Sequence, residues 1–159
     1  MSAIEHRGAF AYYDVLEKLK NNLLSDVNIN TVTEGDITQV NLNKQDIFPL
    51  SHIMVNSVAE NGQILTFNVS VMAMDIVDVS KAETLDIFRG NDNEQDVLNT
   101  QLAVLNKFLQ QLRKGNLHFD GYHLESSANL EPFRDRFENQ VAGWVATFSL
   151  VVMNNIDAC

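Results

Sequence analysis

Residues 52–79 read HIMVNSVAENGQILTFNVSVMAMDIVDV, and this stretch decides the fold. Asn61-Gly62 divides it into two runs that are rich in β-branched and apolar residues. Asn-Gly is the strongest short-range signal for a β-hairpin, because a type I′ turn needs positive φ at both central residues. We therefore expect two long antiparallel strands joined at Asn61-Gly62.

The second of these strands alternates between two faces. The almost wholly apolar face, broken by Asp75, is the expected core face and holds Phe67, Val69, Val71, Ala73, Val77 and Val79. The other face holds Asn68, Ser70, Met72, Met74 and Ile76. A strand of this length extends beyond a small domain, so part of it should project or meet a neighbouring chain. This is the first indication of an assembly protein.

Length and composition fit one folded domain spanning residues 1–159. Charged residues make up 20% of the chain and hydrophobic residues 45%, which is typical of a globular protein. The apolar runs are too short to span a bilayer, and residues 1–10 do not resemble a secretory signal. We expect a protein that is made and folded in the cytoplasm, with no membrane partner.

The net charge is −10, from 11 basic and 21 acidic residues, so the surface should repel nucleic acid. The charge is uneven along the chain. Half of it lies between residues 75 and 96, where Lys81 and Arg89 stand among Asp75, Asp78, Glu83, Asp86, Asp92, Glu94 and Asp96.

Two segments have the periodicity of amphipathic helices. In residues 4–24 the expected stripe is Phe10, Tyr13, Leu16, Leu19 or Lys20, and Leu23, with Gly8 as a weak point. In residues 93–114 the stripe is Leu98, Leu102, Leu105, Leu109 and Leu112, widened by Val97, Val104 and Phe108. Asp92 or Asn93 can cap the second helix.

The remaining segments complete an α+β domain, in which the two helices flank an antiparallel sheet. We expect strands at residues 117–124 and 141–153, the second of them central because both of its faces are largely apolar. Residues 25–51 predict a short strand near Val27, Ile29 and Val32, a turn at residues 34–36, and a strand start or sheet edge at Pro49. Residues 125–140 are expected to form a polar link.

The acidic connection at residues 80–92 contains Leu85, Ile87 and Phe88 among its charges. Apolar residues in a long, charged connection suggest docking onto another surface. The predicted interface residues are therefore Met72, Met74, Asp75, Asp78, Leu85, Ile87 and Phe88.

No catalytic constellation is recognisable, and we expect neither enzymatic activity nor a cofactor. The chain lacks a Gly-rich phosphate loop, a GxSxG elbow and an HExxH motif. The positions of His118 and His123 differ by an odd number, so on one strand the two side chains would point to opposite faces and could not share a metal. The acids near Asp75 lack the spacing of a calcium loop, and Cys159 is the only cysteine.

The order of the elements, together with three local phrases and the amphipathic N-terminal helix, resembles the tail terminator or tail completion proteins of long-tailed bacteriophages. These proteins cap the tail tube and join it to the head connector. The phrases are Asp46-Ile47-Phe48-Pro49-Leu50-Ser51-His52-Ile53, Asp96-Val97-Leu98-Asn99 and Gly143-Trp144-Val145-Ala146-Thr147-Phe148. The resemblance spans nearly the whole chain.

The resemblance implies a homo-oligomeric ring, often hexameric, that has no enzymatic activity and resides in the tail or neck of the virion. Its partners would be copies of itself, the tail tube and the head connector. In such a ring Asp75, Asp78 and Asp86 could line the lumen, where negative charge would let DNA pass without binding.

Two alternatives remain open from the sequence. One is another virion subunit, such as a head–tail connector, tail tube or baseplate protein. The other is a small α+β ligand-binding or enzyme domain with a pocket between helix and sheet, because such folds host many functions.

Overall fold

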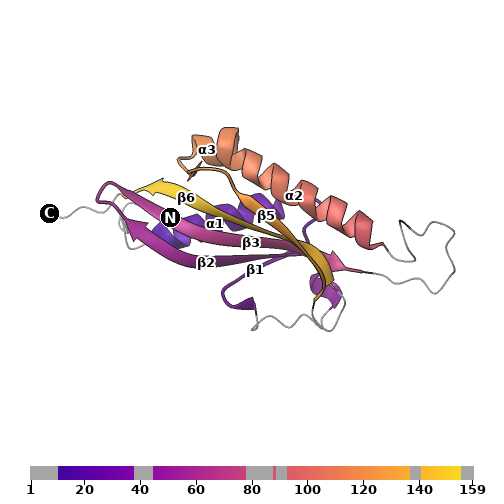
Figure 1. The fold of residues 1–159 in the computed structure, drawn as a ribbon. Coiled ribbons are helices and arrows are strands. Elements are labelled where there is room, and N and C mark those ends of the chain that lie inside the picture. Colours follow the sequence, from indigo (N-terminus) through magenta and orange to yellow (C-terminus); the bar gives the residue numbers. More distant parts are fainter. Residues whose placement is uncertain (1–10, 38–44, 78–87, 89–92, 137–140, 155–159) are drawn as a thin grey trace.

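The computed structural model describes residues 11–37, 45–77, 88, 93–136 and 141–154, and it confirms the α+β class (Figure 1). A six-stranded sheet, mostly antiparallel, is packed against two main helices. In chain order the elements are α1 (Ala11–Leu24), β1 (Thr31–Glu34), the 3-10 turn η3 (Gln45–Ile47), β2 (Leu50–Glu60), β3 (Ile64–Ile76), α2 (Glu94–Lys114), α3 (Asn116–Phe119), β4 (His123–Leu124), β5 (Asn129–Arg136) and β6 (Val141–Met153).

The strand order is β1-β2-β3-β6, and β4 and β5 both pair with the far side of β6. β1 runs parallel to β2, whereas all the other described pairs are antiparallel. The sheet is therefore mixed rather than purely antiparallel as predicted. β6 pairs on both of its sides, which confirms its predicted central place, and its bounds match the prediction.

The β2–β3 hairpin lies where Asn61-Gly62 predicts it, but its turn is shifted by one residue. Asn61 donates its N–H to the carbonyl of Ile64 at 3.1 Å, so the tip consists of Gly62 and Gln63. Gln63 also donates to the carbonyl of Asn61 at 2.7 Å, which closes a three-residue turn around Gly62. Gly62 has φ of 70°, a region that favours glycine.

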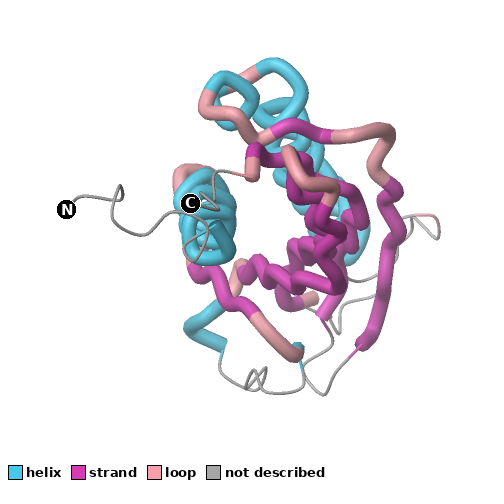
Figure 2. The backbone as a smooth tube through the Cα atoms, turned by 90° about the vertical axis from the view of Figure 1, so that its left-hand side faces the viewer, coloured by secondary structure: helices cyan, strands magenta, loops and turns pink. Residues whose placement is uncertain are grey.

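Both helices cover the same face of the sheet, as the view in Figure 2 shows. This is the predicted core face of β3: Phe67, Val69, Val71 and Ala73 are all buried there. The helices contribute Val15, Leu19 and Leu23 from α1 and Val104, Leu105, Phe108, Leu109 and Leu112 from α2. Each fully buried side chain of this size contributes about 1.5–3 kcal/mol.

The predicted helix stripes need two corrections and one addition. Tyr13 is 63% exposed, and Val15 takes its place in the buried stripe of α1. In α2 the stripe is confirmed except at Leu102, which is only partly buried, and Gln101 is buried alongside it. Phe10 lies outside the described residues.

The predicted strand at residues 117–124 is wrong over most of its length. Asn116–Phe119 form α3, and only His123–Leu124 pair with the sheet. Gly121 has φ of 96°, Tyr122 donates to the carbonyl of Leu117, and Gly121 donates to that of His118. This is the Schellman arrangement that ends a helix. Leu117 is buried against the core from the helix instead of from a strand.

The predicted polar link at residues 125–140 contains a strand instead. β5 pairs with β6 from Asn129↔Thr147 to Arg136↔Val141. Its charged residues and Pro132 suit the edge position that it occupies, since edge strands face solvent on one side. Phe133, only 4% exposed, anchors it.

Candidate assembly surface

The predicted interface residues do not form one exposed surface. Met72 and Met74 are 4% and 0% exposed, because they lie in a second apolar cluster on the sheet face opposite the helices. That cluster also contains Phe48, Leu50, Phe133 and Val141. The assignment of Met72 and Met74 to an interface needs correction: the chain itself covers their side chains, leaving almost no surface for another copy.

Asp75 and Phe88 are the two predicted interface residues that the structure describes outside this cluster. Asp75 is partly buried near the end of β3, and its Oδ1 accepts the N–H of Ile76 at 2.8 Å. Phe88 is 83% exposed, and its carbonyl accepts a hydrogen bond from Nε2 of Gln95 at 2.6 Å. This contact joins Phe88 to the first turn of α2. Asp78, Leu85, Asp86 and Ile87 lie outside the described residues.

The phrases that carry the resemblance come together at the end of the sheet where β3 finishes and α2 begins. Trp144 in β6 donates its Nε1–H to the carbonyl of Leu98 in α2 at 2.8 Å. Leu98 packs with Val77, Val97 and Ala142 in a third apolar cluster, against which Trp144 also lies. The phrase that leads into β2 supplies Phe48 and Leu50 to the second cluster, which includes Val141 just before Gly143.

Gly143 permits the close approach of β6 to β3. It pairs with Met74, and a Cβ atom at this position would overlap the carbonyl of Ala73 and lie 2.8 Å from Cα of Met74. A side chain is therefore excluded by backbone atoms, which cannot rotate away. The glycine of the third phrase has a steric reason that the sequence did not reveal.

His52 in β2 links this strand to β1 at the edge of the sheet. Its Nε2–H donates to the carbonyl of Gly35 at 2.8 Å, and its Nδ1 accepts the hydroxyl proton of Thr33 at 2.7 Å. Burial lowers the pKa of His52, although the Gly35 carbonyl and the charges of Glu34 and Asp36 oppose this shift. The side chain is hydrogen-bonded on both ring nitrogens and has a structural role.

His118 and His123 are side by side, contrary to the prediction of opposite faces. Their rings stack with centroids 4.2 Å apart and an interplanar angle of 23°. The prediction assumed one strand through both residues, whereas His118 belongs to α3 and His123 to β4. Nδ1 of His118 also lies 3.3 Å from the carbonyl of Leu112 at the end of α2.

Beyond the second cluster, the same sheet face carries small polar side chains. Nδ2 of Asn56 donates to Oδ1 of Asn68 at 3.0 Å and to Oγ of Ser70 at 2.9 Å. Oγ of Ser70 lies 3.3 Å from Oγ1 of Thr147. These bonds cross-link β2, β3 and β6. The alternation of Asn68 and Ser70 with apolar residues was the sequence signal for this face.

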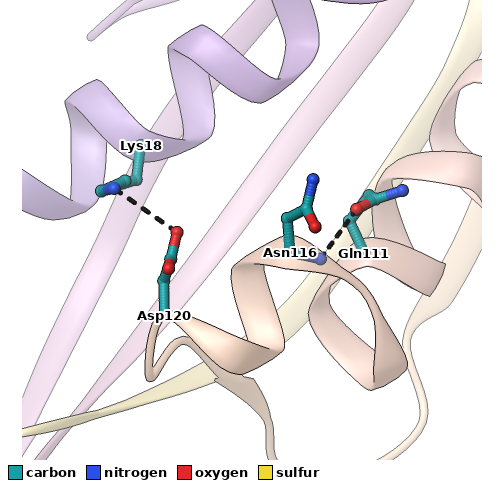
Figure 3. A network of polar contacts seen from close by, with 4 residues as sticks. All are labelled: Lys18, Gln111, Asn116 and Asp120. Atoms are coloured by element: carbon teal, nitrogen blue, oxygen red, sulfur yellow. Dashed lines mark hydrogen bonds and ion pairs between the residues drawn. The ribbon is translucent and has the colours of Figure 1, made fainter.

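A shallow pocket of about 210 Å³ lies between the end of α1 and the middle of α2. Its lining includes Lys107 and Asp26 beside the apolar Phe108. Nearby, Nζ of Lys18 lies 3.4 Å from Oδ2 of Asp120, and the N–H of Asn116 donates to Oε1 of Gln111 (Figure 3). The volume is below the roughly 300–1,000 Å³ of typical ligand pockets. The first contact links α1 to Asp120, which directly follows α3, and the second lies within the bend between α2 and α3.

The described part of the chain contains neither a cluster of metal ligands nor a helix suited to cross a membrane. Within it, no three His, Cys, Asp or Glu side chains are grouped closely enough to hold a metal ion. None of the helices described is long and apolar enough to cross a membrane.

Comparisons with protein-family models and with curated proteins identify no relative of this chain.

Proposed function

We propose that this protein is a structural subunit of a bacteriophage tail or neck. In this proposal, copies of the chain form a hexameric ring that caps the tail tube and joins it to the head connector. The protein acts through assembly and not as an enzyme, is assembled in the host cytoplasm and remains in the virion.

The observation that carries the proposal is the convergence of the three resembling phrases. The Trp144–Leu98 hydrogen bond and the third apolar cluster on the helix face, together with the second cluster on the opposite face, build one end of the sheet from segments far apart in sequence. The resemblance therefore rests on residues that have a common structural role. The acidic connection between β3 and α2 begins and ends at this place.

The charge of that connection gives the proposed ring a physical role. Repeated around a symmetry axis, the acids between residues 75 and 96 would form a negative collar. DNA passing through such a collar would be repelled by the wall instead of adhering to it. Asp75, Asp78 and Asp86 are the acids that we assign to the lumen.

Electron microscopy of the purified protein and of the phage particle tests this proposal. We expect rings of uniform size in the first sample and density for the protein between tail tube and connector in the second. Absence of the protein from the particle would refute the proposed function, whatever its state in solution.

A triple variant Asp75→Asn, Asp78→Asn and Asp86→Asn tests the role of the collar. Asparagine keeps an acceptor oxygen for the N–H of Ile76, so the subunit should fold with an unchanged circular dichroism spectrum. Particles carrying the variant should eject DNA more slowly or assemble in lower yield. The control variant Asp26→Asn removes an acid from the remote pocket between the helices and should leave both unchanged. Equal behaviour of triple variant and wild type would exclude a lumen role for these acids.

A further inference from the structure

β2 has an outer edge that is only partly paired. β1 pairs with β2 from Leu50 to Ile53, and among the described residues no strand continues along β2 beyond that point. We call residues 55–60 the open edge of β2. An unpaired strand edge presents a row of N–H and C=O groups that can accept another strand.

The backbone hydrogen bonds of the hairpin determine which groups of the open edge point outward. Asn61 bonds across to Ile64, and along an antiparallel pair the bonded and non-bonded residues alternate. Ala59 therefore points its N–H and C=O toward β3, whereas Val58 and Glu60 point theirs away from it. At the other end of β2, Ile53 points its carbonyl outward, where it accepts the N–H of Gly35. Ile53 and Glu60 are an odd number of positions apart and yet both point outward, because the bulge at Asn56 inserts one extra residue between them.

The two edges of the sheet differ in how they are protected. On the β5 edge stand Glu131, Pro132 and Arg134, and charge and proline are the usual means of preventing strand addition. Residues 55–59 of the open edge, VNSVA, contain neither a charge nor a proline. The side chain of Val58 is 46% exposed there. The open edge is thus the less protected of the two.

We infer that the open edge of β2 receives an extended segment of a neighbouring copy of this chain, so that one sheet continues across the subunit boundary. The inference rests on the proposed self-association and names the surface that performs it. Copies that each carry a net charge of −10 repel one another, and a neutral edge is where two of them can approach at least cost. The carboxylate of Glu60, the first charge along the strand after these residues, is bound to the N–H of Gly62 in the turn.

The proposed ring requires this pairing to be heterologous, so that the open edge meets a different segment of the next copy. Contacts of this kind repeat head to tail, and they close into a ring when the rotation between neighbouring copies divides a full turn evenly. Main-chain hydrogen bonds then supply the affinity, and burial of Val58 adds to it.

Val58→Pro and Val58→Ala form a matched pair of variants for the test. Proline removes the outward N–H without removing a ladder bond to β3, whereas alanine shortens the side chain and keeps the N–H. Light scattering after gel filtration should show the Val58→Ala variant dissociating only slightly more readily than wild type, because it loses part of the buried side chain, and the Val58→Pro variant dissociating at least tenfold more readily than Val58→Ala. Equal assembly of both variants would overturn the inference while leaving the ring itself intact.

Amide hydrogen exchange on wild-type protein decides the matter if the proline variant fails to fold. We expect the amides of Val58 and Glu60 to exchange at least tenfold more slowly in the assembled protein than in dilute monomer. The amide of Ala59, already bonded to β3, serves as the internal control for local opening. Fast exchange at Val58 and Glu60 in the assembled protein would refute strand addition. A wild-type protein that never assembles would refute both the inference and the self-association on which it rests.

Discussion

Replacing Gln101 with leucine should make the protein more stable. Gln101 lies within the apolar stripe of α2 and is 1% exposed, and among the described residues no group donates a hydrogen bond to its Oε1. A buried polar group without a partner costs about 1–3 kcal/mol. Leucine has a similar volume but a different shape, and such misfits in a core cost up to about 1.5 kcal/mol. We expect a net gain of about 1–2 kcal/mol in the free energy of unfolding.

Urea denaturation followed by circular dichroism measures this gain as a higher transition midpoint with an unchanged slope. For a chain of this length, each kcal/mol raises the melting temperature by about 2–4 °C. Gln111→Leu is the matched control in the same helix. Oε1 of Gln111 accepts the N–H of Asn116 at 3.0 Å, so its loss should destabilise the protein by about 1 kcal/mol. A lower midpoint for Gln101→Leu than for wild type would refute the reasoning.

Three further predictions concern His52, Gly143 and Trp144. The folded state keeps His52 neutral and the unfolded chain protonates it, so the free energy of unfolding should fall as the pH drops below about 6.5. Urea midpoints of wild type and His52→Gln between about pH 7.5 and pH 5.5 check this, and equal pH slopes would contradict it. Gly143→Ala should lower the free energy of unfolding by about 3 kcal/mol, because the methyl group meets β3 backbone atoms. An unchanged urea midpoint would show that the strands can separate at no cost. Trp144→Phe removes the donor to the carbonyl of Leu98, and thermal unfolding should report a loss of about 1 kcal/mol. Full retention of stability would mean that water replaces the bond.

The parts of the fold with a strong period could be predicted from the sequence. The alternation at residues 67–73 assigned the core face of β3, and the spacing of the leucines assigned that of α2. Both patterns are local, and burial of one face is enough to specify them. The hairpin turn was located to within one residue, since glycine determined the place while the register depended on pairing across the strands.

Elements whose structure depends on distant partners were mispredicted. Residues 117–124 alternate as a strand would, but Gly121 at positive φ and the contact of Leu117 with the core favour a short helix. Residues 129–136 look polar because β5 is an edge strand, and its pairing with β6 could not be inferred from its own composition. The stacking of His118 and His123 follows from the first of these errors.

The candidate surface was only partly predictable for a similar reason. The predicted interface included Met72 and Met74, which lie on the face of β3 opposite its core residues. The structure covers that face at one end with Phe48 and Phe133, which come from segments distant in sequence. The open edge of β2 was not predicted, because whether a strand edge is paired depends on where β1 ends.

The mass of the purified protein in solution tests self-association most directly. Sedimentation velocity over a wide range of concentrations should show one closed species whose mass is a whole multiple of the 17.9 kDa chain, and six chains for a hexameric ring. A mass of 17.9 kDa at every concentration up to the solubility limit would contradict the account.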